Sequence, residues 1–288
     1  MASISRIAII GYGEIGRRHH MNLKALGAEI LTCDHNPMIH ADVQTLEEIL
    51  SRQVDGIVIA TPPATHLSLA QHVLQVGLPL LIEKPLGLPE EKLAWQELLH
   101  STQIPVLVGY NWRFEASLQR LVFTPWTVWN CWYGQEPANR HSTWVWNPAQ
   151  GGGALLHYSH ALDLLLWFSS PHPVAVRTLA LTPNEDHARI EFHYQAGSRA
   201  FLELSLSGKW PITILAMTNQ VETSILWHRQ SVVDFNAMYY AEARHFLDCI
   251  RDGAPSRLSP AWPNGAVLLE WITAIRQSAG AGGRWIGI

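Results

Sequence analysis

The sequence predicts an α/β protein with a Rossmann-type, doubly wound parallel sheet at its N-terminus and an α+β domain with an open, largely antiparallel sheet after it. Three observations predict this class. Short apolar runs alternate with helix-like segments over the first 120 residues. These runs are continuously apolar, which is typical of strands buried on both faces. Beyond residue 121 polar and apolar residues alternate instead, as in Glu191–Tyr194, which is typical of a sheet with one solvated face.

The expected elements follow one another in a regular order. The first part has strands at 7–10, 29–33, 56–60, 78–82 and 106–109, separated by helices at 16–26, 46–51, 65–76 and 90–100. Such alternation implies parallel βαβ units with right-handed crossovers. The second part has strands at 126–133, 174–181, 187–194, 199–206, 212–218 and 222–227, and helices at 154–168, 239–252 and 261–278. We therefore expect one domain at 1–120 and another at 121–288.

Composition narrows the class of protein. A length of 288 residues suits two domains, and 48% hydrophobic with 15% charged residues is a globular composition. The net charge of −4 offers no basic field for a phosphate backbone, which argues against a nucleic-acid partner. No apolar run is long enough for a signal segment or a membrane span. Three widely spaced cysteines predict reduced thiols in a cytoplasmic protein.

A glycine motif follows the first predicted strand. Gly11, Gly13 and Gly16 fit the G-x-G-x-x-G pattern between a strand and a helix. Gly11 would allow a tight turn, Gly13 the approach of a pyrophosphate, and Gly16 close packing of the helix on the strand. Glu14 and Ile15 belong to the start of that helix, whose free N–H groups would face the anion. The motif predicts a dinucleotide site.

Asp34 ends the second predicted strand, 23 residues after Gly11. At this place an acidic side chain accepts hydrogen bonds from the adenosine ribose hydroxyls, and it repels a 2′-phosphate. NAD is therefore favoured over NADP, although Arg17 and Arg18 keep NADP open. The alternative is that Asp34 only opens the Asp-His-Asn-Pro turn.

Four further stretches carry a resemblance to a known family. They are Ala-Thr-Pro-Pro-Ala-Thr-His at 60–66, Glu-Lys-Pro at 83–85, Val-Gly-Tyr-Asn-Trp-Arg-Phe at 108–114, and the glycine-led segment 151–163. Their order resembles that of the Gfo/Idh/MocA family of glucose-fructose oxidoreductase and inositol dehydrogenase. The resemblance spans residues 5 to about 170. It implies an NAD(P)-dependent oxidoreductase acting on the CH–OH group of a sugar, sugar derivative or cyclitol, with the second domain serving substrate binding and oligomerisation.

The resemblance also implies roles for single residues. It makes Lys84 and His160 the catalytic pair. A histidine can take the hydroxyl proton near neutral pH, and a lysine can stabilise negative charge on the same oxygen. No metal is expected at the site. The implied cofactor contacts beyond the glycine motif are Thr61, Pro62, His66 and Glu83, and the implied substrate contacts are Lys84, Asn111, Arg113, His157 and Asp163.

Some features leave alternatives open. Many family members have an aspartate where this chain has His157 and a glycine where it has Ser159. The missing carboxylate allows a non-catalytic NAD-binding regulator, and the spacing of His157, His160 and Asp163 allows a metal-dependent hydrolase. His66 and His19 also have an interpretation as packing residues. Half-apolar strands and a tryptophan cluster, which could be core, interface or pocket wall, favour a homodimer or homotetramer. The cluster consists of Trp126, Trp129, Trp132, Trp144 and Trp146.

Overall fold

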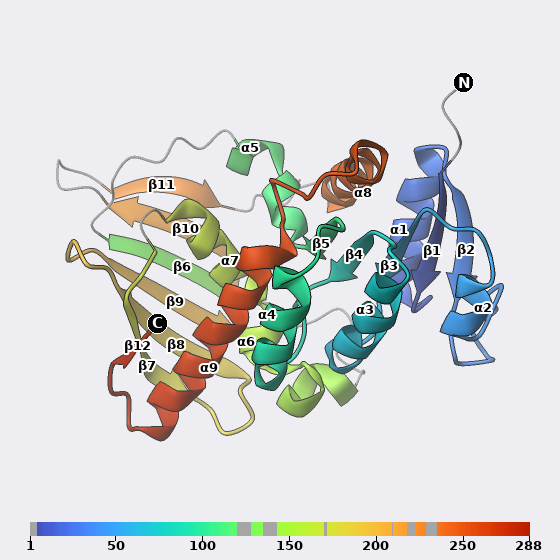
Figure 1. The fold of residues 1–288 in the computed structure, drawn as a ribbon. Helices are drawn as coiled ribbons and strands as arrows, with labels where there is room; N and C mark the ends of the chain where they lie inside the picture. The colour runs from blue at the N-terminus through green and yellow to red at the C-terminus, as the bar shows by residue number, and fades with distance from the viewer. Residues whose placement is uncertain are drawn as a thin grey trace. The chain divides into compact units, whose positions relative to one another are not determined.

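A computed structural model describes residues 5–119, 128–134, 143–169, 172–208, 210–217, 223–228 and 235–288 (Figure 1). The chain divides into two compact units. The first comprises Met1–Gly87, Leu93–Glu115 and Asp234–Ala266, and the second comprises Leu88–Lys92, Ala116–Val233 and Val267–Ile288. Each unit has its own sheet.

The first unit is built on a five-stranded parallel sheet. Its strands are β1 (Arg6–Ile10), β2 (Glu29–Cys33), β3 (Gly56–Ile59), β4 (Leu80–Glu83) and β5 (Val106–Gly109). The order β2-β1-β3-β4-β5 and the parallel pairing of every neighbour confirm the expected doubly wound topology. Strands β3, β4 and β5 are buried along their whole length, which explains their unbroken apolar sequences.

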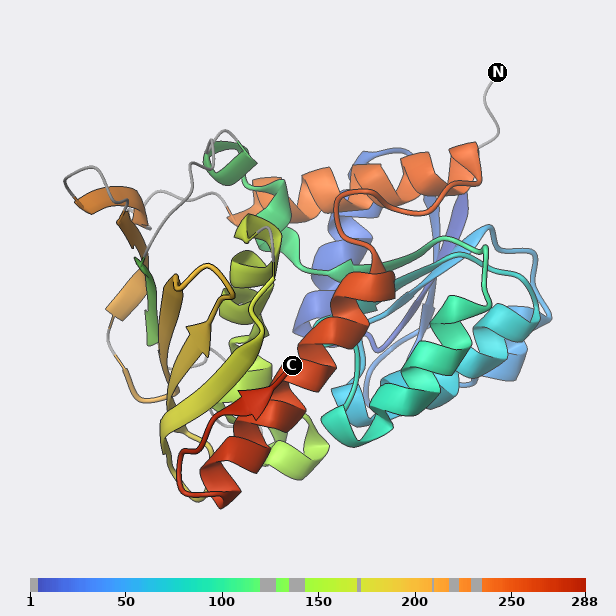
Figure 2. The same cartoon turned by 60° about the vertical axis from the view of Figure 1, so that its left-hand side comes forward.

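Helices cover both faces of this sheet (Figure 2). On one face α1 and α8 pack side by side, and Leu23 and Phe246 join a core that contains Ile7, Ile9 and Val58 of the strands. On the other face lie α3 and α4. The helices of this unit are α1 (Glu14–Ala25), α2 (Leu46–Leu50), α3 (His66–Gln75), α4 (Lys92–His100) and α8 (Phe235–Asp252), with short helical turns η1 (Pro63–Thr65), η3 (Asn111–Phe114) and η6 (Ala261–Gly265).

Helix α8 makes the first unit discontinuous in sequence. The expected division at residue 120 assigned this helix to the second domain, whereas its apolar side chains pack in the core of the first unit. Periodicity predicts that a helix has an apolar face, but it carries no information on which sheet that face covers. The helix also begins at Phe235 rather than at Tyr239.

The second unit contains a seven-stranded sheet. The strand order is β11-β10-β6-β9-β8-β7-β12, and all pairs are antiparallel except β6 with β9, as expected for a largely antiparallel sheet. The strands are β6 (Val128–Gly134), β7 (Ala175–Leu181), β8 (His187–His193), β9 (Arg199–Ser205), β10 (Trp210–Met217), β11 (Thr223–His228) and β12 (Ile286–Gly287).

Helices lie against one face of this sheet (Figures 1 and 2). They include α6 (Gly153–His157), α7 (Ser159–Phe168) and α9 (Ala266–Gly280), whose Ile275 carbonyl accepts a 2.6 Å hydrogen bond from the Thr178 hydroxyl of β7. On the opposite face Glu191 pairs with both Arg177 and Arg199. The remaining short helices are α5 (Ala116–Gln119), η2 (Pro89–Glu91), η4 (Thr143–Trp146) and η5 (Pro148–Gln150).

The expected helix at 154–168 is two helices. Tyr158 leaves helical geometry at φ −102° and ψ 28°, so α6 ends before it and α7 begins after it. The three-residue spacing of His157 and His160 therefore does not place them on one continuous helix face. His160 and Asp163 do share α7.

The tryptophan cluster divides between core and partly exposed positions. Trp129 is fully buried on β6, while Trp132 and Trp146 are partly buried. Trp126 and the side chain of Trp144 lie outside the described residues. Cys33, Cys131 and Cys249 are all buried and unbridged. In the described part of the chain, no helix has the length and apolar character that crossing a bilayer requires.

Candidate active site

The glycine loop between β1 and α1 has the backbone geometry that the motif predicts. Gly11 has φ +89°, and a Cβ there would lie 2.6 Å from the Ala60 carbonyl oxygen. At Gly16 a Cβ would come within 1.9 Å of the Gly11 carbonyl oxygen, so only glycine lets α1 pack this closely. A Cβ at Gly13 would meet no heavy atom within 4 Å. The start of α1 is thus bordered by open space on the side where the motif predicts a pyrophosphate.

Asp34 is buried at the end of β2 and braces this loop. Its Oδ2 accepts a 2.8 Å hydrogen bond from the Tyr12 N–H, and its Oδ1 accepts a 2.9 Å bond from the Asn36 N–H. The bond from Asn36 stabilises the Asp-His-Asn-Pro turn, which is the alternative role expected for Asp34. Each carboxylate oxygen has further acceptor capacity. The turn and a contact with ribose hydroxyls are therefore compatible.

His66 joins the loops that follow β3 and β4. The imidazole is fully buried, with Nε2 2.8 Å from the Thr61 carbonyl oxygen and Nδ1 3.1 Å from the Pro85 carbonyl oxygen. Burial lowers the pKa of His66, and these backbone carbonyls oppose the shift. Thr61 and Pro62 lie in the first of these loops, just before η1. A cofactor contact by His66, Thr61 or Pro62 stays a prediction.

Lys84 follows directly after β4, at the carboxyl edge of the parallel sheet, where ligands of such sheets bind. Its side chain is half-buried. Burial lowers the pKa of Lys84, and the neighbouring Glu83 carboxylate opposes this shift. Glu83 itself points into the unit, and its Oε1 lies 2.8 Å from Nε2 of His19 on α1. A lysine of lowered pKa at a sheet edge can exchange a proton more readily than an exposed one.

Two expected substrate contacts lie on η3 and are buried. Nη1 of Arg113 donates a 2.9 Å hydrogen bond to the Leu258 carbonyl, which ties η3 to the segment after α8. The Oδ1 atom of Asn111 is buried and has no hydrogen-bond partner in the part of the chain that the structure describes. A buried amide oxygen of this kind could accept a hydrogen bond from a ligand. Their roles toward a substrate stay predictions.

His157, His160 and Asp163 belong to the second unit. His160 and Asp163 are buried one turn apart on α7, so they lie on one face of it. His157 is partly buried at the end of α6, and its ring packs against Tyr158 with centroids 4.9 Å apart. The positions of His160 and Lys84 in separate units leave their meeting at one substrate as a prediction.

Sequence reasoning did not assign a site role to two buried residues of the first unit. These are His19 on α1, which was expected only to pack, and Glu242 on α8, which was not singled out. A glutamate on the apolar side of a predicted amphipathic helix is the one signal that could have drawn attention to Glu242.

Comparison with known proteins identifies the family. Residues 5–110 match the profile described as "Oxidoreductase family, NAD-binding Rossmann fold", and residues 125–214 match the Gfo/Idh/MocA C-terminal domain. The chain belongs to the Gfo/Idh/MocA family. It is accordingly an NAD-dependent oxidoreductase, and the resemblance inferred from the four sequence stretches is confirmed.

Relatives of this chain match all of its length or part of it. The rhizopine catabolism protein MocA of Rhizobium meliloti is 23% identical, covering 87% of this chain and 88% of that protein. UDP-N-acetylglucosamine 3-dehydrogenase of Acidithiobacillus ferrooxidans is 29% identical over 40% of each chain. A levoglucosan dehydrogenase solved with NADH and levoglucosan has a TM-score of 0.82 at 17% identity, with 99% of each chain covered. A myo-inositol dehydrogenase of Corynebacterium glutamicum has a TM-score of 0.80 at 21% identity, also with 99% of each covered.

The two glycines Gly16 and Gly13 predict different effects of substitution by alanine on stability and on NADH binding. Gly16→Ala should destabilise the protein by roughly 1–3 kcal/mol or more, because its methyl group would overlap the Gly11 carbonyl. Gly13→Ala should cost less, about 0.5–1 kcal/mol, because alanine is a poorer N-cap than glycine but its methyl group would meet no heavy atom within 4 Å. The same methyl group should nevertheless weaken NADH binding, because it enters the space beside α1. Thermal unfolding and calorimetric titration measure both effects, and unimpaired NADH binding by Gly13→Ala would contradict the site.

Proposed function

We propose that this oxidoreductase interconverts a secondary alcohol and a ketone on a sugar, sugar derivative or cyclitol, using NAD. The observation that carries the proposal is the match of both halves of the chain to one oxidoreductase family, with Lys84 at the carboxyl edge of the NAD-binding sheet. The names of relatives, among them UDP-N-acetylglucosamine 3-dehydrogenase and inositol 2-dehydrogenase, support this substrate class.

The first unit supplies the cofactor contacts in this proposal. Gly11, Gly13 and Gly16 with the start of α1 at Glu14 and Ile15 would hold the pyrophosphate. Asp34 would bind the adenosine ribose. The loops after β3 and β4, which carry Thr61, Pro62, His66 and Glu83, would border the nicotinamide half. NAD, when bound, takes up or releases the hydride.

Side chains of this protein would remove and return the proton of the substrate hydroxyl group. His160 takes the hydroxyl proton from the substrate, and Asp163 orients His160 from the next turn of α7. Lys84 donates a hydrogen bond to the same oxygen and stabilises the negative charge that develops on it. The lowered pKa of Lys84 also supports proton exchange there. Asn111, Arg113 and His157 would contact the remaining hydroxyls.

Neither of the two alternative functions is supported. A metal-dependent hydrolase is contradicted by the family, and His157, His160 and Asp163 do not form a group that could hold a metal ion in the described structure. The break at Tyr158 separates His157 from the other two. A non-catalytic NAD-binding protein is not supported either, because the relatives of this chain are named as dehydrogenases.

Kinetics of Lys84 and His160 variants test the proposal. The substrate is first found by following NADH absorbance over a panel of polyols and nucleotide sugars. Lys84→Met and His160→Asn should each then lower turnover by roughly 10²–10⁴-fold, the usual scale for a positioned acid or base. The double variant should lose far less than the product of the two, because both groups act on one proton.

Two controls accompany this experiment. NADH affinity and Tm should change little in both variants, because neither residue is assigned to pyrophosphate binding or to the core. Lys92→Met, which changes the first residue of α4 and none of the residues assigned to the site, should keep normal turnover. Near-normal turnover of both Lys84→Met and His160→Asn would refute the mechanism.

The coenzyme preference forms a separate prediction. Unaltered protein should bind NADH more tightly than NADPH, because the Asp34 carboxylate repels a 2′-phosphate. Asp34→Asn keeps a side-chain oxygen for the Tyr12 or Asn36 N–H but removes the charge. It should weaken NADH binding by roughly 1–3 kcal/mol and narrow the gap to NADPH. Calorimetry with both coenzymes measures this, and tighter binding of NADPH by the unaltered protein would overturn the role of Asp34.

We also propose a homodimer or homotetramer in the cytoplasm. Partly buried Trp132 and Phe201 on the sheet face opposite α6 support assembly, and three unbridged cysteines support a reducing compartment. Light scattering should give a mass of two or four chains over a wide concentration range. Trp132→Glu, placed beside Glu203, should shift the mass toward one chain. A monomeric unaltered protein would contradict the assembly, and cell fractionation tests the compartment.

A further inference from the structure

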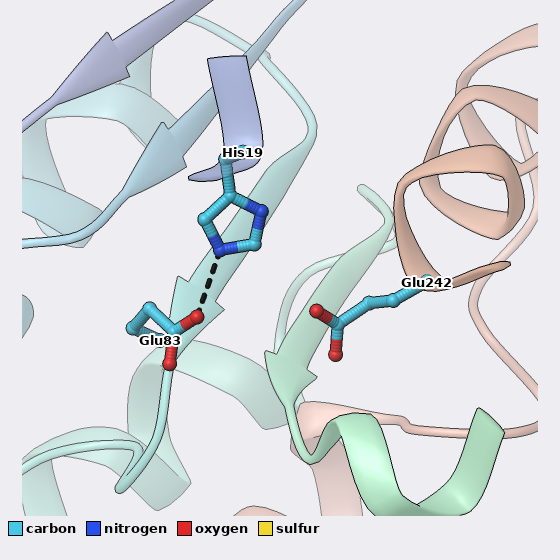
Figure 3. Close-up of side chains that lie close together, drawn as sticks. All are labelled: His19, Glu83 and Glu242. Atoms are coloured by element: carbon cyan, nitrogen blue, oxygen red, sulfur yellow. Dashed lines mark hydrogen bonds and ion pairs between the residues drawn. The ribbon is translucent and has the colours of Figure 1, made fainter. Parts of the chain in front are cut away.

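Three buried polar side chains from distant parts of the sequence meet inside the first unit. His19 comes from α1, Glu83 from the end of β4, and Glu242 from α8 (Figure 3). His19 and Glu242 are 0% exposed and Glu83 is 7% exposed. One potential ligand atom of each lies within 4.8 Å of the others. The proposed mechanism assigns none of the three a proton-transfer role.

The contacts hold Glu83 tightly. Its Oε1 lies 2.8 Å from His19 Nε2, which requires a proton on that nitrogen because a carboxylate can only accept. Its Oε2 lies 3.2 Å from the Lys84 peptide N–H, which donates to it. A Cβ at Gly109 on the neighbouring strand would approach Oε2 to 3.2 Å, so little space remains on that side. The Glu83 carboxylate is thereby linked directly to the backbone of Lys84.

Glu242 faces this pair with no comparable partner. Figure 3 shows its carboxyl group pointing from α8 toward Glu83 and His19. Both of its oxygens are buried, and neither has a hydrogen-bond partner among the described residues. A buried carboxylate with no partner beside a second carboxylate is strongly disfavoured. The group must therefore be neutralised, by a proton or by a bound cation.

The distances favour a proton over a metal ion. Two ligand atoms about 2.0–2.2 Å from one tetrahedral ion would be separated by roughly 3.3–3.6 Å. The 2.8 Å separation of His19 Nε2 and Glu83 Oε1 is instead that of a hydrogen bond. Burial, and then the Glu83 carboxylate, raise the pKa of Glu242 well above its ordinary value.

Lys84 is the charged group that acts on Glu83 from the end of β4, and three further titratable side chains on the packed elements have other partners. Arg113 on η3 donates to the Leu258 carbonyl. Arg18 on α1 lies over the Tyr239 ring at 5.1 Å, and that ring packs edge-on against His19. On α8 itself His245 Nε2 lies 2.9 Å from the Ser256 hydroxyl.

We propose that His19, Glu83 and Glu242 form a buried proton-sharing triad, in which Glu242 is a neutral acid that keeps the Glu83 carboxylate in place and so positions Lys84. The link to Lys84 rests on the proposed function. A second negative charge at Glu242 would repel the Glu83 carboxylate from its bonds to His19 and to the Lys84 N–H. Glu242 is thus a positioning residue that acts through Glu83.

The first test measures the proton without any ligand. In the unfolded chain Glu242 ionises near its ordinary pKa of about 4.3, whereas in the folded chain it stays protonated to higher pH. Between these values the folded state binds more protons, so this group lowers stability as pH rises. Glu242→Gln cannot ionise and escapes this loss. The Tm of Glu242→Gln should therefore rise relative to that of the unaltered protein as pH rises above 5, by roughly 2–4 °C per pH unit for as long as the folded protein keeps Glu242 protonated.

Two readings complete this test. The unaltered protein at pH 7 should show an infrared carbonyl band of a protonated carboxylic acid that Glu242→Gln lacks. Glu97→Gln, which removes an exposed glutamate of α4, should show neither the band difference nor the widening Tm gap. A constant Tm gap with no band difference would overturn the triad. Mass spectrometry could instead find a metal ion in the purified protein, and a chelator could lower its Tm. Glu242 would then be neutralised by a cation and not by a proton, which would also overturn the triad.

The second test concerns Lys84. Glu242→Ala should lower kcat about tenfold with little change in the KM for NAD, and Glu242→Gln should restore most of that loss because it keeps the shape and neutrality of the acid. Equal kcat losses in both variants would overturn the positioning role. Near-normal turnover of Lys84→Met would refute the proposed function instead, and it would leave the infrared and Tm readings as they are.

Discussion

Burial of α8 against α1 and the parallel sheet is the interaction on which the first unit depends. Phe246 and Ala243 are fully buried there and complete the core over Ile9 and Val58. Removing one such aromatic side chain typically costs about 3–5 kcal/mol, a large part of the stability of a domain. The dinucleotide-binding sheet therefore has one face that is closed only when residues 235–252 return to it, long after the chain has left that unit.

The same packing explains why the buried polar side chains His19, Glu83 and Glu242 lie together inside the first unit. A helix that covers an apolar sheet excludes water from every side chain between the two layers, and Glu242 lies there with His19. Ionic groups in such a place need partners or must be neutral. His19 satisfies one oxygen of Glu83, and the Lys84 peptide contacts the other. The interior of the first unit is thus connected, through one carboxylate, to the backbone of Lys84, the residue that we propose acts at the sheet edge.

The two sides of the candidate site are held by different means. The glycine loop is held by sterics, because Gly16 admits no Cβ beside Gly11, and by the Asp34 carboxylate on the Tyr12 N–H. The loops after β3 and β4 are held by His66, whose two ring nitrogens lie against their carbonyls. Such preorganised surroundings let a cofactor bind without much ordering of the protein.

The sequence by itself determined the class, the order of the elements and the glycine loop. Unbroken apolar strands, half-apolar strands and G-x-G-x-x-G are local patterns, and each depends on neighbours within a few residues. Only the tertiary structure decided that α8 belongs with the first sheet, that the 154–168 helix breaks at Tyr158, and that Glu242 meets Glu83 and His19. These features depend on which apolar face covers which sheet and on where buried charges find partners. Helix α8 and its Glu242 lie more than 100 positions from the strands and side chains that they contact in the first unit, so no local pattern encodes these contacts.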